Sequence, residues 1–152
     1  MNIGLGVVSS SFRVGANTFK DAAHEVEKAS DILRNASNNF VGNTSNTITH
    51  AANTFNQASN SLKHTANTFG DALDDLPRNA TNSVAGIGTA SNAVHDIESA
   101  LHNVRGSVQG RFHADVDNAL REIESTTIPA VQGAMHSIKS ASEGTVMTQS
   151  YY

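Results

Sequence analysis

Cysteine and tryptophan are absent from this sequence of 152 residues, and aromatic residues make up only 5% of it. Without cysteine, the chain has no disulfide, no thiolate nucleophile and no zinc site built on cysteine. Much of the apolar content of 38% is alanine, which buries little surface but lets helix backbones approach closely. The sequence therefore offers a thin core made largely of small side chains.

Charge is also scarce, since Asp, Glu, Lys and Arg together make up 16% of the residues and the net charge is -4. The ten Lys and Arg residues are scattered along the chain. A nucleic-acid-binding protein normally carries a basic stripe that neutralises phosphates, so we do not expect nucleic acid as a partner.

Long apolar runs are missing as well. No stretch approaches the roughly 18 apolar residues of a membrane-spanning helix. The opening MNIGLGVVSSSF lacks the basic start and long apolar run of a secretory signal, so we expect no cleavable signal peptide. The location stays open between the cytoplasm and export by a signal-independent route.

Apolar and small residues recur at a spacing close to 3.6 residues, with no period-2 alternation. This spacing is typical of amphipathic α-helices, so we expect an all-α protein without strands. One such series runs from Phe19 to Leu76, and a second runs from Ala80 to Ile123.

The two prolines, Pro77 and Pro129, are the strongest interruptions of this pattern. They predict one helical domain over residues 1–142, with helices over about 10–74, 79–125 and 128–142 and a turn at Pro77. The remaining residues, 143–152, show no periodicity and are expected to form a flexible tail. Helices of this length predict a helical hairpin or an elongated bundle.

A second architecture is compatible with the same sequence. If the segments around Gly42 and around Gly106 to Gly110 are loops, the chain has four shorter helices and forms an up-and-down four-helix bundle. Because the apolar series continues through both segments, the pattern favours the longer helices.

A repeat containing Ala-Asn-Thr-Phe occurs at Ala16–Phe19 and again in the neighbouring segments His50–Lys63 and His64–Pro77. A looser copy lies at Ser37–Phe40, and the Phe residues of the four copies are separated by multiples of seven, except for the step of fifteen from Phe40 to Phe55. Residues seven apart lie on nearly the same side of a helix. The step of fifteen shifts the period towards 3.67 to 3.75, which predicts a nearly straight helix there.

Histidines provide the candidate metal ligands. His95, Glu98 and His102 share one helix face, but no further ligand set accompanies them, so we interpret them as surface residues. His50 and His64 occupy the same place in the repeat beside the apolar stripe, where they either respond to pH in an interface or face solvent. No catalytic, cofactor-binding or metal site is expected, and the protein is not expected to be an enzyme.

From Asn35 to Leu62 the chain contains no Lys, Arg, Asp or Glu. An isolated helix in water usually carries Glu and Lys, so this neutral stretch indicates a partner. Our first hypothesis is a structural protein that self-associates as an oligomer or filament. The alternative is an amphipathic protein of a lipid interface or membrane surface, including a pore former. The interaction seam expected to carry the contact comprises Phe19, Phe40, Phe55, Leu62, Phe69, Leu73 and Leu76.

Two resemblances in composition and period agree with these hypotheses. The Asn-, Ser-, Thr- and Ala-rich helices without Cys or Trp resemble the helical termini of flagellin-type exported filament proteins. The phasing of 11 and 14 residues resembles that of lipid-coating proteins such as perilipins and exchangeable apolipoproteins. Neither resemblance rests on a motif, so no residue takes a role from it.

Overall fold

The computed structural model describes residues 2–73, 85–108 and 113–150, with side chains over 9–73, 85–108 and 113–141. Every element in these residues is helical, which confirms the predicted all-α class. The predicted turn at Pro77 lies outside the described residues.

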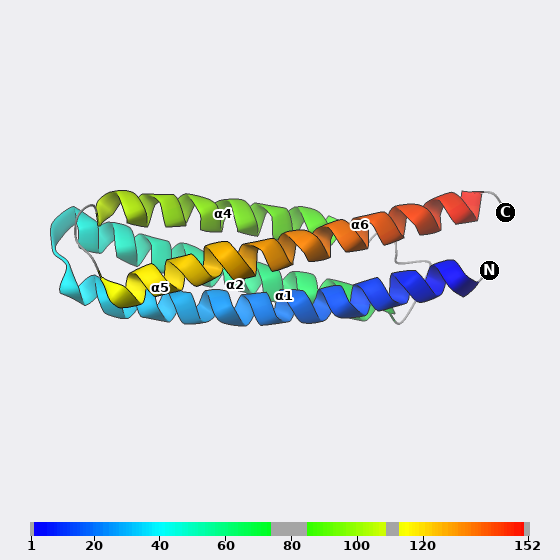
Figure 1. Cartoon of the computed structure of the whole chain (residues 1–152), viewed down its shortest axis with the longest axis horizontal. Coiled ribbons are helices and arrows are strands. Elements are labelled where there is room, and N and C mark those ends of the chain that lie inside the picture. The colour runs from blue at the N-terminus through cyan, green and yellow to red at the C-terminus, as the bar shows by residue number, and fades with distance from the viewer. Residues whose placement is uncertain (1, 74–84, 109–112, 151–152) are drawn as a thin grey trace.

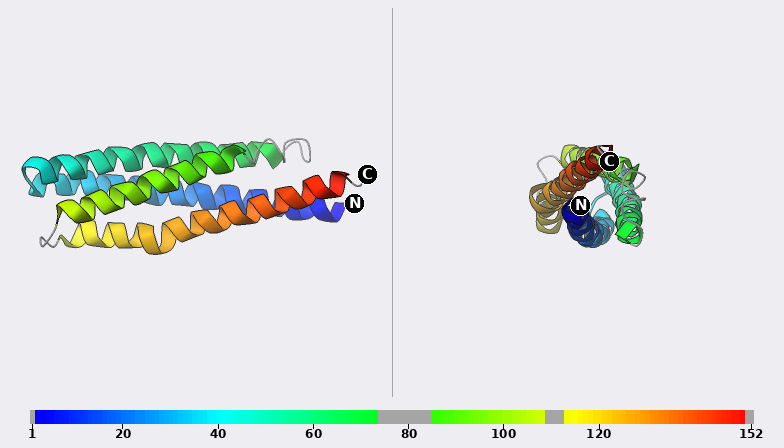
Figure 2. Two further views of the ribbon diagram at one scale, coloured as in Figure 1. Left: turned by 90° about the horizontal axis from the view of Figure 1, so that it is seen from above. Right: turned by 90° about the vertical axis from the view of Figure 1, so that its right-hand side faces the viewer.

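Four long helical segments run up and down along one axis (Figure 1). The first three are α1 (Asn2–Ala36), α2 (Gly42–Ala72) and α4 (Ala85–Ser107). The fourth consists of α5 (Ala114–Glu122), the π-helical segment η3 (Ile123–Thr127) and α6 (Ile128–Ser150). Viewed along the axis, the segments surround a common interior (Figure 2). Of the two predicted architectures, the structure has the up-and-down four-helix bundle.

The expected continuous helix over 10–74 is wrong, because the chain turns back after α1. A short 3-10 helix, η1 (Ser37–Asn39), is followed by Phe40 and Val41 in extended backbone, and Gly42 starts α2 with φ of 61°. Such a positive φ is readily adopted by glycine. The irregular spacing in the sequence falls at this turn. Ile48 follows Leu33 after fifteen residues, one more than two steps of seven. The buried series contains Phe12, Phe19, Val26 and Leu33 in α1, and Ile48, Phe55, Leu62 and Phe69 in α2.

The expected helix over 79–125 is also divided. The helix α4 ends at Ser107, and His113 has extended backbone, with φ of -133° and ψ of 112°, directly before α5. The described part of the expected tail over 143–152 is helical, because α6 extends to Ser150.

The expectation that a separate helix over 128–142 starts near Pro129 is wrong. Pro129 instead follows a widened turn in a continuous helical segment. The backbone N–H of Ile128 donates to the carbonyl of Ile123, five residues earlier, which is the pattern of a π-helix. Proline lacks the N–H of a helix interior, and its ring collides with the carbonyl four residues before it. The widened turn accommodates one extra residue, so that Val131 follows Ile123 in the core after eight residues.

Small residues form the contact between α1 and α2. Ala23 and Ser30 on α1 and Ala52 and Ser59 on α2 are buried in this contact, each pair spaced by seven residues. Two buried serines cross this contact in opposite directions, and Oγ donates to a backbone carbonyl at 2.7 Å in both. Ser30 donates to Ala52, and Ser59 donates to Ala23. The alanines allow the close approach that these short bonds require.

Phenylalanine fills the wider part of the core. The ring of Phe69 lies edge-on to that of Phe12, with centroids 5.0 Å apart, and stacks with that of Phe19 at 5.8 Å. All three side chains are fully buried. The helices α1 and α2 are therefore joined by an aromatic cluster as well as by small residues.

Candidate interaction surface

The predicted interaction seam lies mainly inside the bundle. Phe19, Phe55, Leu62 and Phe69 have no exposed surface, so one chain buries them among its own helices. Phe40 and Leu73 are half-buried against this core. Leu76 lies outside the described residues. In the folded bundle, contact with another molecule must use other side chains.

The Ala-Asn-Thr-Phe repeat has the same local structure in all three copies. Each threonine donates from Oγ1 to the carbonyl four residues earlier, from Thr18 to Val14 at 2.9 Å, from Thr54 to His50 at 3.1 Å and from Thr68 to His64 at 3.0 Å. Each Phe is buried and each Asn is exposed. The repeat thus places an aromatic ring inside and an amide outside.

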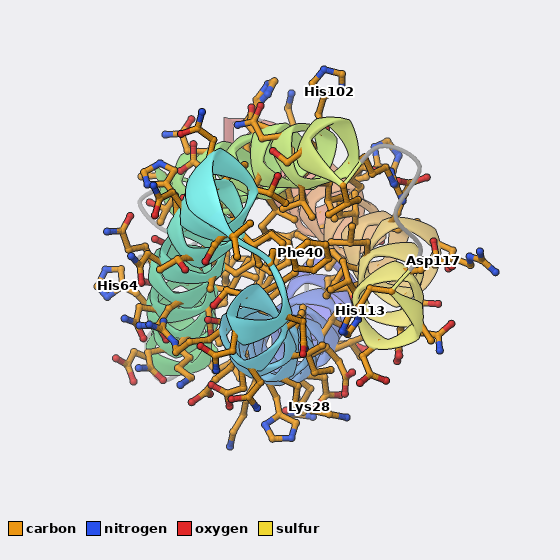
Figure 3. All side chains as sticks on the ribbon, turned by 90° about the vertical axis from the view of Figure 1, so that its left-hand side faces the viewer. Lys28, Phe40, His64, His102, His113 and Asp117 are labelled. Atoms are coloured by element: carbon orange, nitrogen blue, oxygen red, sulfur yellow. The ribbon has the colours of Figure 1, made fainter. Side chains whose placement is uncertain are left out.

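Four of the exposed asparagines form a column along α2. Asn46, Asn53, Asn60 and Asn67 are seven residues apart, and all four side chains are exposed. A second exposed column, of His50, Gln57 and His64, runs beside it with the same spacing. These seven residues are termed the α2 outer face. His64 points away from the bundle in the view along its axis (Figure 3).

The sequence-based hypothesis located the neutral stretch but missed the asparagine column. The signal is present in the sequence, since the asparagines recur every seven residues as regularly as the buried apolar residues. It is hidden because Asn, Ser and Thr are common throughout the chain.

Charged groups stand at the borders of the α2 outer face. Arg34 of α1 donates to Oδ1 of Asn53 at 3.2 Å, and Lys63 of α2 pairs with Glu27 of α1 at 3.1 Å. Between Gly42 and Leu62, α2 itself has no Lys, Arg, Asp or Glu. The face therefore presents amides and imidazoles over most of its length.

Two grooves flank α4. The groove between α2 and α4 has a volume of about 200 Å³, with Ala51 and Ala100 between a polar rim that includes His50, Thr54 and Asp96. The groove between α4 and the η3–α6 segment is larger, at about 290 Å³. Leu101 and Ile128 lie in it, and the ion pair of Arg105 with Glu124 spans it.

Among the described residues, no group of three or more His, Asp or Glu side chains is placed to hold a metal ion. His95, Glu98 and His102 are exposed on α4. Figure 3 shows His102 pointing outwards.

His113 has a structural position at the end of the bundle. Its Nδ1 accepts from the backbone N–H of Val116 at 3.4 Å and so caps α5, while its Nε2 lies 3.3 Å from Nδ2 of Asn39. A neutral imidazole that accepts at Nδ1 carries its hydrogen on Nε2, so it pairs with Asn39 when that amide presents its oxygen. The ring also contacts Phe40, whose centroid is 5.8 Å away (Figure 3). His113 thus joins the α1–α2 turn to the start of α5.

None of the described helices combines the length and apolar character that crossing a membrane requires. No protein-family model, curated protein or solved structure matches the chain. The proposal of a function therefore rests on the bundle and its surface.

Proposed function

We propose that this protein is a non-enzymatic structural protein that acts through self-association of its folded helical bundle. The observation that carries the proposal is the α2 outer face, which is exposed, regular and without charged side chains between Gly42 and Leu62.

Neutrality favours a second copy of the chain as the partner. When two identical surfaces meet about a two-fold axis, each charged side chain faces a copy of its own surface and often lies near a side chain of the same charge. Like charges in contact weaken such an interface, whereas an asparagine amide both donates and accepts hydrogen bonds. A repeated column of amides is therefore compatible with itself.

The location of the Phe residues supports association of closed bundles. Because Phe19, Phe55 and Phe69 are buried in their own chain, an association through them would require the bundle to open. Association through the α2 outer face leaves the core intact. The helix content of the protein should therefore be the same before and after assembly.

The direct test is sedimentation equilibrium of the full chain over a wide concentration range, with circular dichroism at each concentration. We expect the average mass to rise with concentration while helicity stays constant. A mass that stays monomeric at all concentrations would refute the proposal.

Two double variants separate core from surface. Phe55→Ser with Phe69→Ser should unfold the chain, since truncating a buried Phe costs about 3–5 kcal/mol. His95→Ala with His102→Ala changes exposed residues on α4 and should alter neither helicity nor mass. A loss of assembly in the histidine variant would move the contact to α4.

A second candidate function, binding at a lipid interface, is favoured by the groove between α4 and the η3–α6 segment. There Leu101 and Ile128 lie beneath an exposed rim, so separation at this groove would begin to present the apolar helix faces. Flotation with neutral liposomes tests this candidate. Binding accompanied by exposure of the core would support it, and absence of the protein from the floated fraction would exclude it.

A further inference from the structure

We propose that two copies of the bundle pair through their α2 outer faces, with the helices antiparallel and a two-fold axis close to Gln57. This inference rests on the proposed self-association and specifies its surface and orientation. It follows from the positions of the exposed side chains along α2.

The two exposed columns are arranged almost symmetrically about Gln57. His50 and His64 lie seven residues on either side of it, and Asn53 and Asn60 lie four residues before and three residues after it. Asn46 and Asn67 continue the pattern outwards. Read in the opposite direction, the face therefore presents nearly the same side chains at nearly the same heights.

In an antiparallel two-fold pair the symmetry axis is perpendicular to the helices, so each column stays on the same side of the contact in both copies. The asparagine column of one copy therefore faces the asparagine column of the other. With Gln57 facing its own copy, His50 faces His64 of the second copy. Asn53 then lies within one residue, roughly 1.5 Å of rise, of Asn60 of the second copy. Each asparagine amide can thus donate to and accept from another asparagine amide.

The surroundings of the face are compatible with this pairing. Thr54 beside the column of His50, Gln57 and His64 uses its hydroxyl hydrogen within its own helix, which leaves the oxygen as an acceptor. Lys63 pairs with Glu27 of its own chain at 3.1 Å, and Arg34 donates to Asn53 of its own chain at 3.2 Å. A second copy therefore meets no unpaired charge from Lys63.

A charge-swap experiment tests the orientation. In Asn53→Asp with Asn60→Asp, the proposed pairing places acid against acid at both contacts. In Asn53→Asp with Asn60→Lys, it places acid against lysine at both. A parallel two-fold pairing would instead put position 53 level with position 53 of the second copy and position 60 level with position 60, so neither variant would place acid against lysine. Both variants contain the same Asp beside Arg34, so the effect of that neighbour is equal in the two.

We expect the Asp–Asp variant to weaken association about tenfold or more at low salt, with partial recovery at high salt. The Asp–Lys variant should associate at least as tightly as the unmodified chain. Asn17→Asp changes an exposed asparagine of the same repeat on α1 and should leave association unchanged. Circular dichroism should report the same helicity for all of them.

The outcomes separate this inference from the proposed function. If the unmodified chain never associates, the proposed function fails. If it associates and the Asp–Asp variant associates equally well, self-association stands and the α2 outer face is not the surface. If both charged variants are weakened alike, the face is used but the antiparallel orientation is overturned.

Discussion

At the scale of single residues, the absence of side-chain bulk determines how closely the helices approach. Gly15 of α1 lies against Ile138 of α6, and a Cβ added to Gly15 would stand 2.3 Å from Cδ1 and 3.0 Å from Cγ1 of Ile138. Ile138 is fully buried, so its side chain has little room to move. Gly88 on α4 differs, since a Cβ added there meets no atom within 4 Å.

These two glycines give opposite predictions for the same substitution. Gly88→Ala should stabilise the bundle by about 0.5–1 kcal/mol, because alanine favours a helix interior over glycine. Gly15→Ala should destabilise it by about 1–3 kcal/mol, because overpacking outweighs that gain. Adding Ile138→Val to Gly15→Ala removes Cδ1 and should recover part of the loss. Urea unfolding measures all three, and equal stabilisation at both glycines would contradict the close packing of α1 and α6.

At the scale of elements, the sequence predicted which faces are buried better than where helices end. The helical period placed Phe19, Phe55 and Phe69 on one apolar stripe, and the bundle buries all three. The period failed after Phe40, where the delay of one residue before Ile48 marks a turn instead of a straight helix. A similar delay between Ile123 and Val131 marks a π-helical segment. Both solutions return the apolar face to the core, so periodicity alone does not distinguish them.

The α2 outer face was also predictable from the sequence only in part. The lack of charge from Asn35 to Leu62 is visible in the sequence, and it covers most of the α2 outer face. Whether Phe55 and Leu62 faced a partner or their own chain was not predictable, because both arrangements bury the same stripe. Only the packing of α2 against α1 and α4 decides it.

The π-helical segment gives a prediction at this scale. Deleting the exposed Ser125 should convert it to an α-helix, which places the carbonyl four residues before Pro129 against the proline ring. The deletion alone should cost about 3 kcal/mol or more. Combined with Pro129→Ala it should be nearly neutral, because the helix then keeps its hydrogen bonds and its buried series continues every seven residues.

Unfolding experiments on the deletion, the substitution and their combination measure this coupling. Additive effects would show that Pro129 does not account for the widened turn. Crystal structures are not needed for that decision, since the coupling free energy alone distinguishes the two cases.

At the scale of the whole molecule, the two candidate functions differ in whether the bundle opens. Among the described side chains, the exposed large hydrophobic residues are Val14 and Val41, with 61% and 78% of their surface exposed. They lie far apart in α1 and in the α1–α2 turn, so the closed bundle presents no broad apolar face there. Self-association through α2 needs no opening, whereas lipid binding through the core residues requires it.

Cross-linking the groove beside α4 separates these functions. The chain has no cysteine, so Arg105→Cys with Glu124→Cys introduces two thiols where α4 and η3 are bridged by an ion pair. A short bis-maleimide should hold this side closed, and a monofunctional maleimide on the same variant serves as the control. We expect cross-linking to leave the sedimentation of the assembly unchanged, because the α2 outer face is remote from the link. If the protein binds liposomes by opening, the cross-link should abolish flotation while the control still floats. Equal flotation of both forms would show that lipid contacts the closed bundle, and the buried Phe residues would then have no part in binding.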